Sequence, residues 1–88
     1  MRVTQNTYSL TVGAVYTDAV GEPELVAIGS YNYCKQVMER IIRDSRELKL
    51  NFTESEPGEN HVFVGVTAVG STKRCYVIED MRYVYMED

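Results

Sequence analysis

Several residue types that carry common chemistries are scarce in this sequence. Its 88 residues include no tryptophan, two cysteines, two prolines and a single histidine. No apolar run approaches the roughly 20 residues that a helix needs to cross a bilayer. The polar segment from Met1 to Asn6 lacks the apolar stretch of a signal peptide. These absences predict a cytoplasmic protein that begins at its native methionine and has no membrane segment.

The scarcity of cysteine and histidine also argues against the usual metal sites. A zinc site needs closely spaced Cys and His ligands, whereas Cys34, His61 and Cys75 lie far apart along the chain. In a cytoplasmic protein the two cysteines are expected to be reduced, small core residues. In a secreted chain they could instead form a disulfide. We therefore predict no metal and no other cofactor.

Catalytic motifs are equally scarce. His61 is the only candidate base for a Ser–His or Cys–His pair, and it stands where an acidic loop enters a strand, which is usually an exposed position. Glu79 and Asp80 are adjacent on a strand, so their side chains point to opposite faces unless the strand is bulged. The glycines form neither a dinucleotide-binding pattern nor a P-loop. The sequence thus predicts a protein that is not an enzyme, with a small enzyme or ligand-binding subunit as the lowest-ranked alternative.

The charge of the chain is acidic and unevenly spread. The formal net charge is −4, from 9 Lys and Arg residues against 13 Asp and Glu residues. Four of these bases and three of these acids lie between Asn32 and Glu47, so the remainder of the chain is strongly acidic. A phosphate-binding surface needs clustered Lys and Arg. Direct binding to nucleic acid is therefore not expected, although a local basic stripe between Asn32 and Glu47 remains the alternative.

Five segments alternate between apolar and polar residues with the period of two that is typical of strands. Polar residues rich in Gly, Pro and Asp separate them, most clearly at 18–23 and 54–60. The predicted strands are residues 8–17, 24–29, 48–53, 61–69 and 74–86. The first two are expected to form a hairpin with a long loop.

Between the second and third predicted strands, the hydrophobic period changes to that of a helix. Charged residues fall mostly on the opposite side of this helix, and Ser30 or Asn32 can cap its start. The apolar residues at helical spacing are Cys34, Val37, Met38, Ile41 and Ile42. The order β-β-α-β-β-β predicts a single α+β domain over residues 1–88, with a mainly antiparallel five-stranded sheet and one amphipathic helix packed on one face.

The last two predicted strands differ in the number of their apolar faces. The fourth has one regular apolar face, which we assign to the core and which consists of Val62, Val64, Val66 and Ala68. The fifth is apolar on both faces. A β-bulge at Glu79 and Asp80 would shift its phase by one residue. The inward residues would then be Tyr76 and Ile78 before the bulge, and Met81, Tyr83 and Tyr85 after it.

Tyrosine dominates the aromatic residues, with seven copies against two phenylalanines. Tyrosine suits partly exposed contact surfaces, so Tyr31, Tyr33, Tyr83 and Tyr85 are interface candidates, with the alternative that they only cap the edges of the sheet. Tyr8 and Tyr16 are expected in the core. Because one helix covers one face of a sheet, the long last strand is expected to leave apolar surface that a second copy covers in a homodimer. The alternative is a strand that coils over its own core. The candidate self-association residues are Tyr83, Val84, Tyr85 and Met86.

The chain is small and acidic, starts at its own methionine and has no catalytic motif. In these features it resembles the accessory proteins that bacteriophages encode. The resemblance implies a non-enzymatic protein-binding module in the host cytoplasm, for example an inhibitor of a host defence or nucleic-acid-handling protein. Acidic turns would meet a basic surface on this host protein. The candidate partner-binding residues are Asp18, Glu22, Glu24, Glu54, Glu56 and Glu59. The alternative is a self-assembling structural component whose sheet associates with copies of itself.

Overall fold

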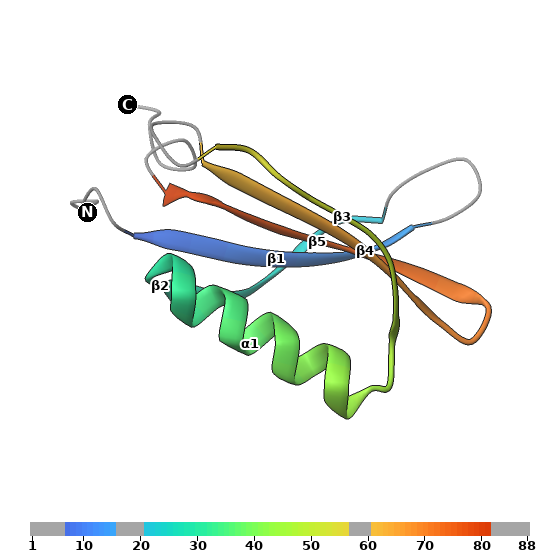
Figure 1. Cartoon of the computed structure of the whole chain (residues 1–88). Helices are drawn as coiled ribbons and strands as arrows, with labels where there is room; N and C mark the ends of the chain where they lie inside the picture. Colours follow the sequence, from blue (N-terminus) through green and yellow to red (C-terminus); the bar gives the residue numbers. More distant parts are fainter. Residues whose placement is uncertain (1–6, 16–20, 57–60, 82–88) are drawn as a thin grey trace.

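The computed structural model describes residues 7–15, 21–56 and 61–81. They form one five-stranded antiparallel sheet and one helix, in the predicted α+β order (Figure 1). The elements are β1 (Tyr8–Val15), β2 (Glu24–Gly29), α1 (Tyr31–Asp44), β3 (Leu48–Glu54), β4 (Val62–Val69) and β5 (Thr72–Asp80). Within the described residues, no helix is both long and apolar enough to span a membrane.

The first and last strands lie side by side in the sheet. The strand order is β2-β1-β5-β4-β3, and every neighbouring pair is antiparallel. In this register Ile78 of β5 pairs with Leu10 on one side and with Phe63 on the other. Strand β5 is therefore hydrogen-bonded along both sides, and β2 and β3 form the two edges. A shift of register interrupts the pairing of each edge strand, a device that discourages pairing with another chain.

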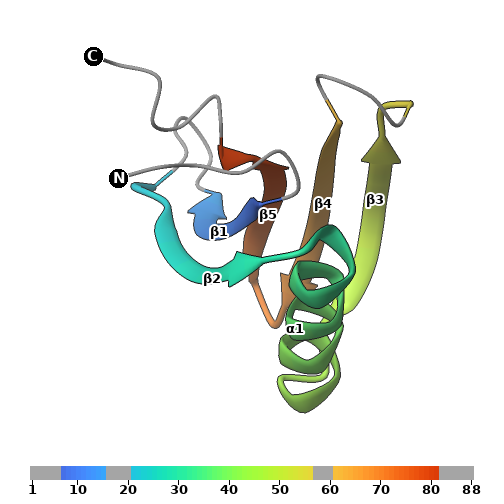
Figure 2. The same ribbon diagram turned by 90° about the vertical axis from the view of Figure 1, so that its left-hand side faces the viewer.

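Helix α1 covers one face of the sheet with the apolar side chains that the sequence predicts (Figure 2). Of the two candidate caps, Ser30 is the one used, because its side chain accepts a hydrogen bond from the Tyr33 amide at 3.0 Å. The buried residues of the helix are Cys34, Met38 and Ile42. Together with Leu10, Phe63, Tyr76 and Ile78 from the sheet, they form the core.

The turn that ends the helix lacks the glycine that usually follows a helix C-cap. The Glu47 amide donates to the Ile42 carbonyl at 2.9 Å, and the Arg46 amide donates to the Arg43 carbonyl at 3.1 Å. This pair of bonds is a Schellman motif, which requires a left-handed residue one position beyond the cap. Arg46 takes that position with a φ of 54°, although glycine adopts it at lower cost.

The core face of β4 is the reverse of the one predicted. Phe63, Gly65 and Thr67 are buried toward the helix, so the four predicted core residues lie on the opposite face and are only partly buried. Gly65 allows this face of β4 to be the buried one, because a Cβ at this position would come within 2.9 Å of the Phe52 ring. The space is filled instead by the edge-to-face rings of Phe52 and Phe63, whose centroids are 5.2 Å apart.

Strand β5 runs from Thr72 to Asp80 and contains no bulge over this length, and residues 82–86 of the predicted strand lie outside the described residues. Its register with β1 continues unshifted to Asp80, where the strand ends. Tyr76 and Ile78 point inward as expected, and Met81 is buried as well. The Met81 side chain points inward because the strand ends at Asp80 and its alternation stops there, not because of a bulge. Tyr16 and the predicted self-association residues Tyr83, Val84, Tyr85 and Met86 lie outside the described residues.

Candidate functional site

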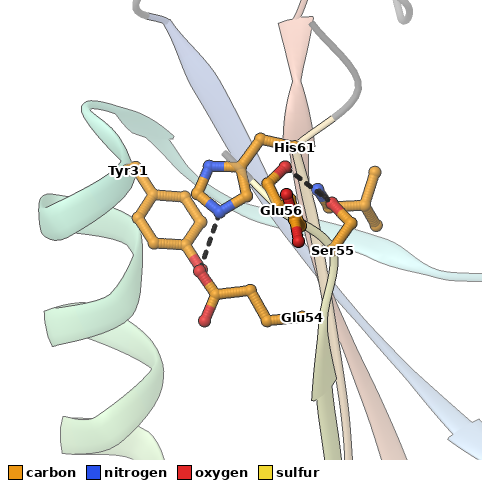
Figure 3. Close-up of polar contacts among 6 residues, drawn as sticks. Tyr31, Glu54, Ser55, Glu56 and His61 are labelled. Atoms are coloured by element: carbon orange, nitrogen blue, oxygen red, sulfur yellow. Dashed lines mark hydrogen bonds and ion pairs between the residues drawn. The ribbon is translucent and has the colours of Figure 1, made fainter. Parts of the chain in front are cut away.

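A polar cluster joins the start of α1 to the edge of the sheet (Figure 3). Tyr31 is the first residue of α1, Glu54 is the last residue of β3, and His61 directly precedes β4. The Tyr31 hydroxyl donates to Glu54 Oε2 at 2.5 Å, and His61 Nε2 lies 2.7 Å from the same oxygen. The rings of Tyr31 and His61 stack with their centroids 4.2 Å apart. We call this group the Tyr31–Glu54–His61 cluster.

Two predictions about this cluster are wrong. His61 was expected to be exposed, but it is buried because the Tyr31 ring stacks on it and the Tyr8 ring meets it edge-on. Glu54 was expected in a polar loop, but it closes β3 and is held by two side chains. The spacing of these residues in sequence gives no sign of the cluster, which depends on the pairing of β3 with β4.

The electrostatics of the cluster hold two of its groups in their ordinary protonation states. The hydrogen bond from Tyr31, followed by that with His61, lowers the pKa of the Glu54 carboxyl. Burial, followed by the hydrogen bond to Glu54, raises the pKa of the Tyr31 hydroxyl. A general acid or base works best with a pKa near the operating pH, and both shifts lead away from neutrality. The cluster therefore suits a structural tie better than proton transfer.

A buried carboxylate lies at the other end of α1. The side chain of Glu47 is 0% exposed. It accepts hydrogen bonds from Thr67 Oγ1 at 2.6 Å, from the Tyr76 hydroxyl at 2.7 Å and from an Arg74 guanidinium nitrogen at 2.5 Å. Three donors, one of them cationic, satisfy the buried charge. Glu47 thus fastens the end of the helix to β4 and β5, a role that its place in a charged stretch of sequence does not reveal.

The predicted acidic binding residues do not form one surface. Glu22 and Glu24 lie at the β2 edge of the sheet, whereas Glu54 and Glu56 lie at the opposite edge, formed by β3. Glu54 is also held within the Tyr31–Glu54–His61 cluster. The remaining two candidates, Asp18 and Glu59, lie outside the described residues.

The two cysteines lie on opposite sides of the sheet. Cys34 is buried beneath α1, and Cys75 is on the other face and partly exposed; both are free thiols. The sheet between them rules out the disulfide considered for a secreted chain. Burial raises the pKa of both thiols, so neither is an activated nucleophile. Among the described residues, no group of three or more His, Cys, Asp or Glu side chains could hold a metal ion.

The sheet face opposite α1 is apolar at its centre. Strand alternation brings four partly buried side chains of β4 and β5 together there, in the cross-strand pairs Val64–Val77 and Val66–Cys75. We call this face the open face and these four residues its apolar block. A cavity of about 200 Å³ extends from the block toward β1. Sequence reasoning missed this surface because it assigned the valines of β4 to the core.

The segment Gly21–Pro23 borders the open face on its β1 side. Gly13 is buried under this segment, and a Cβ at Gly13 would lie 3.2 Å from the Gly21 carbonyl oxygen and 3.4 Å from the Pro23 Cα. The Gly21 amide also donates to the Ala14 carbonyl at 2.6 Å. The glycine at position 13 thus allows the segment to lie against β1 and leaves β5, β4 and β3 to present the open face.

The structural features therefore fall into two groups. The polar groups at the two ends of α1 have their partners inside the chain, whereas the apolar block faces away from the only helix of the described residues. The chain matches no protein-family model, no curated protein and no solved structure. The functional argument consequently depends on the open face.

Proposed function

We propose that this chain is a non-enzymatic protein-binding module whose contact surface is the open face. The observation that carries the proposal is the apolar block, in which Val64, Val66, Cys75 and Val77 lie side by side and partly exposed. Burial of apolar surface contributes about 25 cal/mol per Å². Contiguous apolar patches on a small protein typically mark sites of interaction. A partner laid on this face would remove the block from water.

The polar clusters support binding rather than catalysis. Glu47 is saturated by three donors, and Glu54 is held ionised between two side chains. A catalytic carboxylate needs access to substrate and a pKa near the working pH. Neither carboxylate meets both conditions, and both hold the helix in place against the sheet.

An inhibitory role toward a host protein remains the prediction from sequence. In such a complex the apolar block would supply most of the affinity. Glu22 and Glu24 at one edge of the sheet and Glu56 at the other are exposed. Glu24 pairs with Val12 and so lies on the face that α1 covers, and Glu22 lines a pocket together with Ile41 of α1. Glu56 is left to meet basic residues at the rim of the interface, where opposite charges speed association and set specificity.

A charge placed in the apolar block tests the proposal. Val77→Lys introduces an ammonium group at the centre of the open face while its stem keeps some apolar contact. The matched control is Arg40→Glu, which alters an exposed charge on the outer side of α1. Each tagged variant is used to capture proteins from a lysate of the cells in which the chain naturally occurs.

The expected result is a partner that the parent and Arg40→Glu retain and that Val77→Lys loses. Thermal melts of the three proteins verify that each is folded at the temperature of capture. If a folded Val77→Lys protein captures the same partner as the parent, the open face is not the contact surface and the proposal is wrong.

A further inference from the structure

A cavity of about 490 Å³ lies between α1 and the strands β2, β1 and β5. Helix α1 diverges from β1 toward the C-terminal end of the helix (Figure 1), and the cavity lies on this side of the sheet. Its volume is within the range of about 300–1,000 Å³ that is typical of small-ligand sites. We call this cavity the hairpin groove. Its walls include Val12, Ala14, Glu22, Glu24, Ile41 and Arg74.

We propose that the hairpin groove binds a small organic cation that carries an aliphatic chain. The charged group of this ligand would lie against the carboxylates of Glu22 and Glu24, and its chain would lie on the apolar floor of the groove. The groove is on the side of the sheet that α1 covers, opposite the open face. The inference therefore does not depend on the protein-binding role of the open face.

Two carboxylates stand together on the β2 side of the groove. Glu24 pairs with Val12 across the hairpin, so its side chain lies on the helix side of the sheet, and Glu22 lines the same cavity. Both residues are exposed. In the part of the chain that the structure describes, neither takes part in an ion pair. Two neighbouring like charges repel each other, and a cation between them relieves this repulsion.

The charge on the opposite wall of the groove is already offset. Arg74 pairs with Ala14 and lines the groove on its β5 side. One of its guanidinium nitrogens donates to the buried carboxylate of Glu47 at 2.5 Å, so the charges of these two residues balance. The net charge of the groove consequently comes from Glu22 and Glu24 and is negative. A cation would be attracted to the groove, whereas an anion would be repelled.

The floor of the groove is apolar. Val12 and Ala14 alternate with Gly13 along β1 and face α1, and Ile41 closes the groove from the helix. All three side chains are partly buried. Val26, which is 41% exposed, extends this floor toward the opening. An aliphatic chain on the floor would remove apolar surface from water, which is favourable in proportion to its area. The groove thus suits a ligand that has both a charge and a chain.

Titration with matched small molecules tests the site. The probe is hexylamine at neutral pH and low salt, and binding is followed through the backbone amide signals of the protein in NMR spectra. Hexanol has the chain without the charge, methylamine has the charge with almost no chain, and hexanoate has the opposite charge. We expect hexylamine to bind the parent with a Kd on the order of 1 mM. The largest shifts should occur at Val12, Ala14 and Val26.

The comparison molecules should show that both parts of the ligand are needed. Hexanol and methylamine should bind at least about ten-fold more weakly than hexylamine, because each lacks one of the two contributions. Hexanoate should not bind. Hexanol that binds as tightly as hexylamine, or methylamine that does so, would overturn the inference.

Removal of the carboxylates separates this site from a general attraction of cations to an acidic protein. Glu22→Gln and Glu24→Gln should each weaken hexylamine binding about two- to five-fold, which is the effect of losing one exposed ion pair, and the double variant about ten-fold. The matched control is Glu56→Gln, which removes an exposed charge near the opposite edge of the sheet. It should leave the Kd within about two-fold of the parent. The same spectra verify that each variant is folded. Equal weakening by Glu56→Gln would overturn the inference.

Two further arms distinguish other occupants and the other face. If the blocked peptide Gly-Lys-Gly binds more tightly than hexylamine, the groove is a site for a protein segment and the inference is wrong. Val77→Lys, which changes the open face, should bind hexylamine as the parent does. A loss of binding in this variant would place the site on the open face and would also overturn the inference. The protein-binding role is decided separately by the capture experiment.

Discussion

The Tyr76 hydroxyl donates a hydrogen bond to the Glu47 carboxylate at 2.7 Å, in the buried region where α1 turns toward β3. Thr67 and Arg74 donate to the same carboxylate. This contact links residues that are 29 positions apart in the sequence. The end of the helix is thus held to the middle of the sheet by one charged side chain and three donors.

Removal of this carboxylate should be among the most damaging single changes in the chain. Glu47→Ala leaves three donors without their acceptor, and breaking a buried ion pair typically costs about 3–5 kcal/mol. We expect a loss of that size in the free energy of unfolding, measured by urea denaturation. Tyr76→Phe removes one donor and should cost about 1–3 kcal/mol. The matched control Glu56→Ala, at an exposed site, should change stability by no more than about 0.5 kcal/mol. Equal losses from the two glutamate variants would contradict the buried role of Glu47.

The same tyrosine predicts how stability declines at alkaline pH. Burial, followed by the hydrogen bond to Glu47, raises the pKa of Tyr76 to about 12, against about 10 in an unfolded chain. The folded state therefore binds this proton more tightly than the unfolded state. Its contribution to stability is complete below pH 10 and is lost as the pH rises from about 10 toward 12. Denaturant unfolding between pH 9 and 11.5 should show a steeper decline for the parent than for Tyr76→Phe. Identical pH dependence in the two proteins would refute the assignment.

The Tyr31–Glu54–His61 cluster predicts a change in the titration of a neighbouring group. Because the hydrogen bond from Tyr31 is the largest cause of the lowered pKa of Glu54, Tyr31→Phe should move that pKa back toward the ordinary value of about 4.3. A lowered pKa stabilises the fold above the unfolded value, and this stabilisation is lost as the pH falls through the folded pKa. Tyr31→Phe should therefore reduce the acid sensitivity of the fold. Side-chain NMR titration measures the pKa, and Tyr33→Phe, at a side chain 50% exposed, is the control. An unchanged pKa for Glu54 in Tyr31→Phe would count against the hydrogen bond.

The turn after α1 offers a stabilising substitution. Arg46 has a φ of 54°, and a left-handed conformation costs a non-glycine residue about 1–2 kcal/mol. Glycine removes this cost but increases the entropy of the unfolded chain, so the net gain from Arg46→Gly should be about 0.5–1 kcal/mol. The matched control is Ser45→Gly, at the preceding residue with a φ of −89°, which should destabilise the protein. Thermal melts decide the matter, and a lower melting temperature for Arg46→Gly would show that the turn is not strained.

The sequence predicts the elements of this fold better than their faces. Periodicity identified the helix and five strands because apolar and polar residues alternate regularly in the sequence of each, even in the edge strands β2 and β3, which are largely exposed. The face of β4 was predicted wrongly because Val64 and Val66 belong to a regular apolar alternation, whereas Gly65 and Thr67 look like residues of a solvent-exposed face. Their burial depends on the Phe52 ring and on the Glu47 carboxylate, which reach β4 only through tertiary packing.

The candidate surface depends on the same tertiary information. The open face could be inferred only in outline, from the observation that one helix covers one side of a sheet. Its location on β4 and β5 requires the strand order, which no hydrophobic pattern specifies. The Tyr31–Glu54–His61 cluster likewise requires the pairing of Glu54 with Phe63, which places the end of β3 beside the start of β4.

Adjacent isoleucines in α1 provide the last test, because their neighbouring positions lie at different depths in the core. Ile42 is 4% exposed within the core, whereas Ile41 is only partly buried at its margin. Truncation of a buried isoleucine typically costs about 2–5 kcal/mol, through lost burial and the cavity left behind. Ile42→Ala should therefore destabilise the protein by about that amount, and Ile41→Ala by clearly less, because part of its side chain already contacts water. Arg40→Ala, on the exposed side, should remain within about 0.5 kcal/mol of the parent. The loss in the free energy of unfolding should therefore be largest for Ile42→Ala, smaller for Ile41→Ala and smallest for Arg40→Ala. A greater loss for Ile41→Ala than for Ile42→Ala would mean that the helix is rotated about its axis relative to the sheet.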